Sequence, residues 1–193
     1  VHRDVSPQNI LVGFDGGVKL IDFGVAKVAG RAQHTATGIV KGKYAYMSPE
    51  QIRGEPMDRR SDVFSLGVVL WECLSLRRLF HAENVPAILV QILEGKRVAP
   101  SQFRPEVSRE LDAIALKALA IDPADRFQSA LEMKRALEDV IWQSRCDAGD
   151  VQVSAGQARE LCGRFIDNGD HQSPNLRRAT ERVGKIFDAI EKP

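Results

Sequence analysis

Three short strings of the sequence carry side chains whose types and spacing suit chemistry. Asp4 and Asn9 lie in the first string, and Asp22 opens the second. Carboxylate and amide oxygens are ligands for a hard divalent cation, and a carboxylate can also accept a proton. Taken singly, such residues more often belong to a solvated loop or a turn than to a reactive site. The strings are, in chain order, His2-Arg3-Asp4-Val5-Ser6-Pro7-Gln8-Asn9, Asp22-Phe23-Gly24 and Ser48-Pro49-Glu50.

A predicted hairpin holds two of these side chains opposite each other. The apolar runs 10–12 and 18–21 flank Asp15-Gly16-Gly17, and Asp-Gly between two such runs is a strong hairpin signal. Asn9 enters the first strand and Asp22 leaves the second. We therefore expect the strand ends to hold both side chains more firmly than free loops would.

The rest of the chain predicts a long loop over 23–47 and then about four helices. The nearly all-apolar stretch 63–74 suits a buried central helix, with Asp62 as its N-cap. A second helix is predicted over 84–93, ended by Gly95. Apolar residues recur at helical spacing over 111–119 and again over 130–141. The pattern therefore indicates an α-rich domain with little β-structure.

Composition limits the class of protein. The chain has 193 residues, and 27 Lys+Arg against 26 Asp+Glu give a net charge of +1. So balanced a charge gives no reason to expect nucleic acid or an anionic membrane as a partner. The longest apolar run, 66–71, is far short of the roughly 20 residues that span a bilayer. Three widely spaced cysteines are typical of reduced thiols, so we expect a cytoplasmic protein.

Together, the three strings closely resemble the C-terminal lobe of eukaryotic-like, bacterial-type serine/threonine protein kinases. They are similar to the catalytic loop H-R-D-x-x-x-x-N, the D-F-G motif and a variant of A-P-E. The resemblance covers residues 1–142 and implies a mainly α kinase C-lobe, whose small hairpin carries the catalytic and D-F-G motifs. Residues 143–193 carry no such resemblance, and we expect a linker over 143–156 followed by helices over 158–165 and 176–190.

The resemblance implies transfer of the γ-phosphoryl group of ATP to a serine or threonine hydroxyl of a protein substrate. By their places in the motifs, Asp4 would be the catalytic base, and Asn9 and Asp22 would bind Mg²⁺ or Mn²⁺. Asp22 would thereby also belong to the nucleotide site. Leu11 is similar to the residue that packs under adenine, although an ordinary core leucine is the alternative.

Regulatory positions are implied in the same way. Arg3 resembles the arginine that receives a phosphorylated activation-loop residue. Thr35 and Thr37 are then the expected phosphorylation sites, with solvated loop threonines as the alternative. A phosphate there would bring about −1.5 to −2 charge toward Arg3.

Other positions would hold the fold together. Asp62 resembles the aspartate that braces the catalytic-loop backbone, a role compatible with an N-cap. Glu50 and Arg126 resemble the buried ion pair that joins the activation segment to the helical lobe, with unrelated surface charges as the alternative. The remaining structural members of the motifs are His2, Phe23 and Gly24.

Two departures from the family pattern are reciprocal. The position that usually carries a lysine, two residues after the catalytic aspartate, is Ser6, and the usual neighbouring threonine is Lys43. Lys43 is therefore a candidate catalytic residue whose ammonium would reach the γ-phosphate, against the alternative of a solvated lysine.

Gln8 also replaces a frequent glutamate, which weakens any case for basic substrates. The main hypothesis is an active kinase, and the alternative is a pseudokinase scaffold impaired by Ser6.

The sequence contains neither the Gly-rich phosphate loop nor the strand lysine of the family's N-terminal lobe. We expect these elements to precede Val1 in a longer protein. Because ATP is held between two lobes, the chain alone is expected to be inactive.

Overall fold

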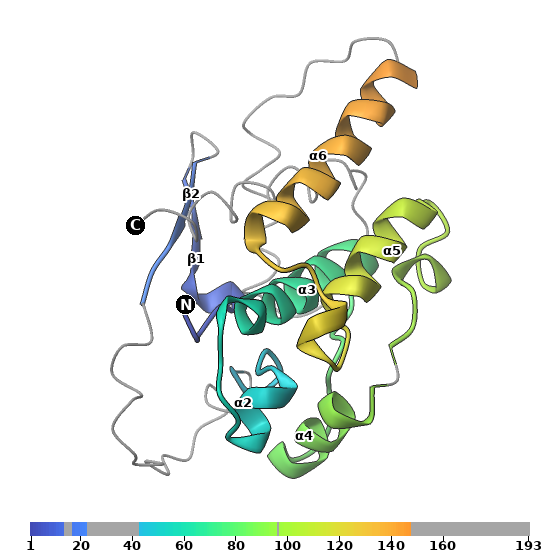
Figure 1. Cartoon of the computed structure of the whole chain (residues 1–193). Helices are drawn as coiled ribbons and strands as arrows, with labels where there is room; N and C mark the ends of the chain where they lie inside the picture. Colours follow the sequence, from blue (N-terminus) through green and yellow to red (C-terminus); the bar gives the residue numbers. More distant parts are fainter. Residues whose placement is uncertain (14–16, 23–42, 96, 148–193) are drawn as a thin grey trace.

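One long buried helix lies at the centre of the fold, and two later helices pack against it (Figure 1). The computed structural model of the chain describes residues 1–13, 17–22, 43–95 and 97–147, with side chains up to 141. As the sequence predicts, this part of the chain is rich in helix and has a small two-stranded sheet. The elements are η1 Pro7–Asn9, β1 Ile10–Val12, β2 Val18–Leu20, α2 Pro49–Arg53, α3 Arg59–Ser75, α4 Val85–Glu94, η3 Pro100–Gln102, α5 Arg109–Ala118, η4 Pro123–Asp125 and α6 Ala130–Asp147.

Helix α3 is the predicted central helix, but it begins earlier than expected. Asp58, not Asp62, is the N-cap, because the Asp58 carboxylate accepts a hydrogen bond from the Arg60 amide. Asp62 therefore lies inside the first turn, where its carboxylate is available to another segment. The helix ends at Ser75, and its C-cap Leu76 has a left-handed φ of 56° and donates its amide to the Glu72 carbonyl.

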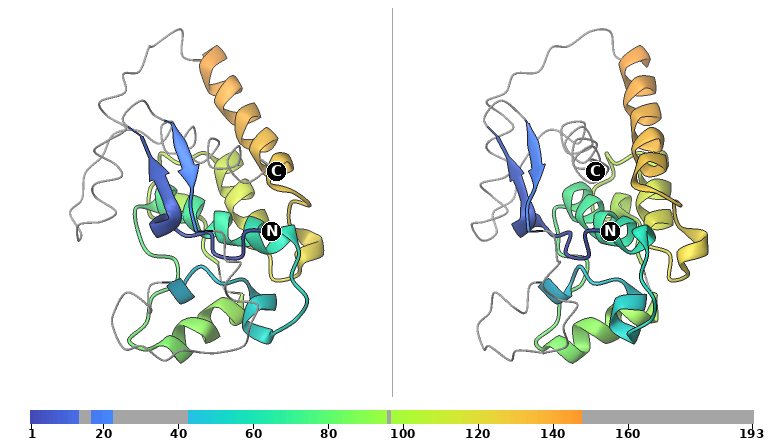
Figure 2. Two further views of the ribbon diagram at one scale, coloured as in Figure 1. Left: turned by 90° about the vertical axis from the view of Figure 1, so that its left-hand side faces the viewer. Right: turned by 60° about the vertical axis from the view of Figure 1, so that its left-hand side comes forward.

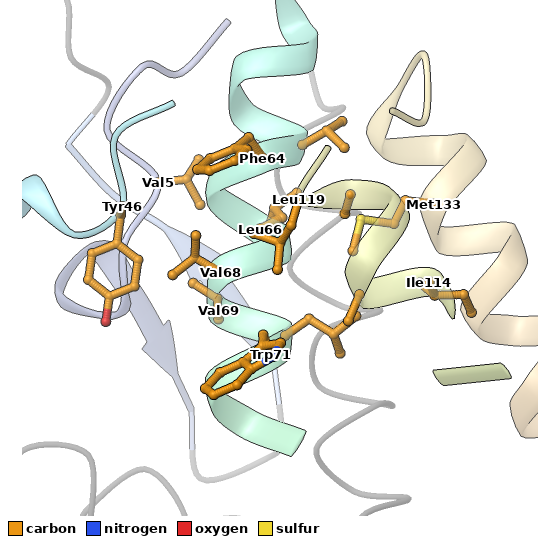
Figure 3. Close-up of a cluster of buried hydrophobic side chains, with 14 of the residues drawn as sticks. Val5, Tyr46, Phe64, Leu66, Val68, Val69, Trp71, Ile114, Leu119 and Met133 are labelled. Carbon is orange, nitrogen blue, oxygen red and sulfur yellow. The ribbon is translucent and has the colours of Figure 1, made fainter. Parts of the chain in front are cut away.

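The core lies on both sides of α3. Helices α5 and α6 pack on the side away from the hairpin, as two further views show (Figure 2). Figure 3 shows Val5 and Tyr46 on one side of α3, with Leu119 and Met133 on the other. Side chains along α3 such as Phe64 are fully buried, and each contributes about 1.5–3 kcal/mol through removal of apolar surface from water.

The predicted hairpin is confirmed in position and pairing. Strands β1 and β2 are antiparallel, with Ile10 opposite Leu20 and Val12 opposite Val18. Helix η1 leads into β1, with Pro7 in its first turn, where a missing amide costs no helical hydrogen bond. The hairpin therefore connects the first two motif strings directly.

The four helices predicted between residues 62 and 141 are present, and one short helix was missed. Helix α4 has Asn84 as its N-cap and Gly95 as its left-handed C-cap, in agreement with the sequence. The short helix α2 was missed because five residues show no periodicity, although Ser48 and Gln51 form a capping box.

Helix α6 continues past 142 to Asp147, since no glycine or proline occurs before Gly149. Residues 143–147, which were predicted to belong to a linker, are therefore helical. The helices predicted over 158–165 and 176–190 lie outside the described residues. In the part of the chain that is described, no helix is both long and apolar enough to cross a bilayer.

Gly67 allows α3 and α5 to approach closely, and Gly67→Ala is expected to destabilise the protein. A Cβ at this position would lie 2.8 Å from the Ala118 Cβ and 3.3 Å from the Leu119 Cγ. Overpacking of this kind costs about 1–3 kcal/mol, which exceeds the helix-propensity gain of about 1 kcal/mol. The midpoint of urea unfolding measures the loss. Adding Ala118→Gly should recover part of it, and an unchanged midpoint for Gly67→Ala would contradict this packing.

Candidate active site

The backbone of the first string is held by a buried carboxylate from α3. Asp62 accepts hydrogen bonds from the His2 amide at 2.7 Å and from the Arg3 amide at 2.8 Å. Burial raises the pKa of the Asp62 carboxyl, and these two amide hydrogen bonds act in the opposite direction. Arg3 has a left-handed φ of 67°, a strained conformation for a non-glycine residue that the two hydrogen bonds hold in place.

Backbone hydrogen bonds bring the second string next to the first. The Ile21 amide donates to the Asn9 carbonyl at 2.9 Å, and the His2 Nε2 lies 3.1 Å from the Ile21 carbonyl oxygen. Asp22 directly follows Ile21, is exposed, and has a left-handed φ of 57°. The two ends of the hairpin therefore place Asp22 beside Asn9, as the sequence predicts for their backbones.

The Asn9 side chain is oriented by Asp4. Its Nδ2 donates to the Asp4 carbonyl at 2.7 Å, and the residue is only 2% exposed. With Nδ2 used in this way, the amide oxygen remains as an acceptor. The Asn9 oxygen and the Asp22 carboxylate form a donor set of oxygens alone, which fits Mg²⁺ or Mn²⁺. Among the described residues, His, Cys, Asp and Glu form no group of three or more that would hold a metal ion without Asn9.

The Asp4 carboxylate is paired with a lysine from a distant part of the chain. Lys43 Nζ lies 3.0 Å from Asp4 Oδ2, and the two side chains are 33% and 14% exposed. Lys43 begins a segment that we call the activation-segment end, residues 43–48. The structure therefore brings together the candidate base and the candidate cation, and Lys43 does not point into open solvent.

The third string is joined to the helical core by a buried ion pair. Arg126 Nη1 and Nη2 donate to the two Glu50 carboxylate oxygens at 2.8 and 2.9 Å, and Ser61 Oγ donates to one of them at 2.6 Å. Burial alone would raise the pKa of the Glu50 carboxyl, but the hydrogen bonds from Arg126 and Ser61 outweigh it and lower the pKa to about 2. In addition, Gln51 Nε2 donates to the Arg3 carbonyl at 3.1 Å, which connects α2 to the first string.

A second anchor of the activation-segment end was not predicted. The Tyr46 hydroxyl donates to the buried Glu72 Oε2 at 2.7 Å and accepts from the Arg78 guanidinium, and Ser65 Oγ donates to the Tyr46 carbonyl at 2.7 Å. Burial raises the pKa of both the Tyr46 hydroxyl and the Glu72 carboxyl. The signal in the sequence was Glu72 itself, a single acidic residue in the predicted buried helix 63–74.

The remaining predicted residues divide into two groups. Leu11 lies on β1 with 51% of its surface exposed, so it is not the ordinary core leucine that was the alternative. The predicted positions that lie outside the described residues are Phe23, Gly24, Thr35 and Thr37.

Comparison with known proteins agrees with this geometry. A family model described as the protein kinase domain matches residues 1–139. The chain belongs to the protein kinase family. Among curated relatives, it is 45% identical over 155 residues to the tyrosine-protein kinase MasK of Myxococcus xanthus, which covers 80% of this chain and 24% of MasK.

Other relatives of the chain are named as serine/threonine-protein kinases. The chain is 43% identical over 169 residues to PknB of Mycolicibacterium smegmatis, covering 86% of the chain and 27% of that protein. It is 42% identical over 138 residues to PknB of Mycobacterium leprae, covering 71% and 22%. The chain thus resembles bacterial protein kinases, and it spans about a quarter of the length of the curated relatives that it matches.

Proposed function

We propose that residues 1–142 are the C-terminal lobe of an active protein kinase, which transfers the γ-phosphoryl group of ATP to a serine or threonine hydroxyl of a protein substrate. The observation that supports this proposal most is the hydrogen-bonded arrangement of the first two strings. Asn9 donates to the Asp4 backbone, and Asn9 also accepts from the residue before Asp22. A candidate base and two candidate metal ligands are thereby held at one end of the hairpin.

Each side chain has a distinct task in this proposal. Asp4 orients the substrate hydroxyl and accepts its proton as the oxygen attacks the γ-phosphorus. Asn9 and Asp22 hold Mg²⁺, which when bound neutralises charge on the phosphates. The exposed Leu11 packs against the adenine ring, and this accounts for an apolar side chain that the described residues leave uncovered. Phosphoryl transfer needs little more from a protein than positioning and charge stabilisation.

The rest of the proposal concerns the whole protein. The N-terminal lobe, with its Gly-rich loop and ATP-binding lysine, would precede Val1, and the chain alone would then lack half of the nucleotide site. The Thr35 and Thr37 hydroxyls are proposed as phosphorylation sites, and residues 143–193 as a tail outside the catalytic domain. We propose a cytoplasmic kinase domain that binds ATP and protein substrates and does not bind nucleic acid.

Phosphate transfer by the longer protein tests the function. The protein that includes the segment before Val1 is incubated with labelled ATP, Mg²⁺ and a generic protein substrate, and the labelled product is hydrolysed to its phosphoamino acids. We expect phosphoserine and phosphothreonine. Bound ATP with no transfer would instead support the pseudokinase alternative.

A second candidate function is transfer to tyrosine. It is favoured by one specific finding, the 45% identity to a relative named as a tyrosine-protein kinase. The same hydrolysis separates the two candidates, because phosphotyrosine as the main product would replace the serine/threonine assignment and leave the kinase assignment intact.

A further inference from the structure

The contact that departs most from the family pattern is the ion pair between Asp4 and Lys43. It joins Lys43 Nζ and Asp4 Oδ2 at 3.0 Å across 39 residues of sequence. The lysine side chain is about one-third exposed, so its ammonium is neither buried in the core nor free in solvent. A long flexible stem lets such an ammonium move between neighbouring anions by rotation alone.

Between Asp4 and Asn9, the catalytic loop itself offers no cation. Val5 to Gln8 contain no basic residue, and Ser6 occupies the position where the family usually has a lysine. Ser6 is 1% exposed, and its Oγ has no hydrogen-bond partner among the described residues. Within the first string, a short buried side chain therefore replaces a charged one.

We propose that Lys43 supplies the positive charge for the transferred phosphoryl group, and that this charge is available only when the activation-segment end is docked on α3. The proposal rests on the proposed kinase function. In the usual arrangement the cation and the base share one loop, so docking of another segment is not needed to bring them together. Here the base comes from residues 2–9 and the cation from residues 43–48.

Docking of the activation-segment end is carried by Tyr46. Its hydroxyl donates to Glu72 at 2.7 Å, its carbonyl accepts from Ser65 at 2.7 Å, and its amide donates to the Lys43 carbonyl at 3.2 Å. Tyr46 is 5% exposed. One tight turn therefore separates Lys43 from a buried anchor, and this turn fixes the backbone from which the lysine extends.

Lys43 takes no part in making or breaking bonds during the proposed transfer. The bond between the γ-phosphorus and the ADP oxygen breaks, the bond to the substrate oxygen forms, and the hydroxyl proton passes to the Asp4 carboxylate. The Lys43 ammonium keeps its protons and stabilises the negative charge of the phosphoryl oxygens. Its move from Asp4 toward the phosphate also removes the lysine contact from Asp4 Oδ2 before the carboxylate accepts the proton.

The first test measures turnover in the protein that includes the segment before Val1. Lys43→Ala should lower kcat by about 10²–10³, the range found when one stabilising group is removed. Lys43→Arg should retain part of the activity. Ser6→Lys combined with Lys43→Thr should exceed Lys43→Thr alone by at least about tenfold, because the charge returns on the other loop. As a matched control, Lys134→Ala removes a lysine that lies 3.7 Å from Glu138 on α6, and it should leave kcat within about twofold.

The second test asks whether the charge depends on docking. Tyr46→Phe removes the hydroxyl that holds Glu72, and its effect on kcat is measured in the wild type and in the Ser6→Lys, Lys43→Thr background. We expect at least a threefold larger loss in the wild type, because only there does the cation lie on the docked segment. Equal losses in the two backgrounds would overturn the dependence on docking, since a double-mutant cycle without coupling indicates independent sites.

A binding measurement separates failure of this inference from failure of the proposed function. The ratio of the Kd for ADP to the Kd for a non-hydrolysable ATP analogue reports contacts to the γ-phosphate. Lys43→Ala should reduce this ratio by about tenfold, whether or not the wild type transfers phosphate. If the wild type transfers no phosphate but Lys43→Ala still reduces the ratio, the proposed enzymatic function is wrong and the proposed Lys43 contact to the γ-phosphate is supported. An unchanged ratio, with kcat also within a few-fold of wild type, would overturn the Lys43 proposal.

Discussion

Replacing Asp4 by asparagine is expected to reduce kcat by about 10²–10⁴ in the protein that includes the segment before Val1, because the variant loses the group proposed to accept the hydroxyl proton. The amide oxygen of the new side chain can still accept a hydrogen bond from Lys43, whose Nζ lies 3.0 Å from Asp4 Oδ2. The Asn9 contact is to the Asp4 backbone carbonyl and is retained. The change therefore removes the base and leaves these two contacts in place.

Turnover at saturating ATP and substrate, together with the melting temperature, separates a chemical loss from a folding defect. We expect a melting temperature within about 2 °C of wild type, since no core contact is lost. Asp125→Asn is a matched control, because Asp125 is an exposed aspartate in η4. A kcat for Asp4→Asn within a few-fold of wild type would show that another group accepts the proton.

The local parts of this site could be predicted, because each depends on a few adjacent residues. The hairpin follows from two apolar runs around Asp15-Gly16, and its pairing then places Asn9 beside Asp22. The start of α3 was misplaced because Asp58 and Asp62 both suit an N-cap, and only the Arg60 amide, which bonds to Asp58, decides between them.

The long-range contacts of the site could be predicted only where a family pattern indicates them. The Lys43 side chain was placed toward the catalytic loop only because Ser6 and Lys43 depart together from such a pattern. Tyr46 and Glu72 are 26 residues apart, and nothing local indicates that a tyrosine hydroxyl will satisfy a glutamate inside an apolar helix. A buried glutamate requires a partner, but the sequence does not say which segment provides it.

Removal of one partner of the Glu50–Arg126 pair is expected to cause the largest loss of stability. Arg126 is 2% exposed, and its guanidinium also donates to the carbonyls of Ala120, Ile121 and Arg60 at 2.8–3.0 Å. It lies 5.0 Å from the centre of the Phe64 ring. Arg126→Met should lower the free energy of unfolding by about 3–5 kcal/mol, because it leaves a buried carboxylate without its counter-charge.

Urea unfolding of the chain at pH 7 measures this loss against an exposed pair. Arg53 and Glu55 lie 3.8 Å apart on the surface, so Arg53→Met is the same chemical change at a solvated site and should cost less than about 1 kcal/mol. Arg126→Lys should recover little of the lost stability, since an ammonium cannot replace the planar, bidentate contact of a guanidinium. Equal losses for Arg126→Met and Arg53→Met would contradict the buried pair.

The lowered pKa of Glu50 predicts how the stability of the fold depends on pH. The pKa of Glu50 falls from its ordinary 4.5 to about 2 in the folded protein. A carboxyl with a lowered folded pKa stabilises the fold above its unfolded pKa, and it loses that contribution as the pH falls toward the folded value. The gap, meaning the difference in free energy of unfolding between wild type and Glu50→Gln, should therefore be constant above about pH 5.5. It should shrink by about 1 kcal/mol by pH 3.5.

The comparison with Glu50→Gln is needed because other buried carboxyls titrate in the opposite sense. Burial raises the pKa of Asp62 and Glu72, so their contribution to stability grows as the pH falls, and it is common to both proteins. Subtracting the two curves leaves the part due to Glu50. A gap that stays constant from pH 7 to 3.5 would show that Glu50 is not held as a carboxylate by Arg126. The Glu50 and Arg126 side chains would then stabilise the fold only through hydrogen bonds and packing.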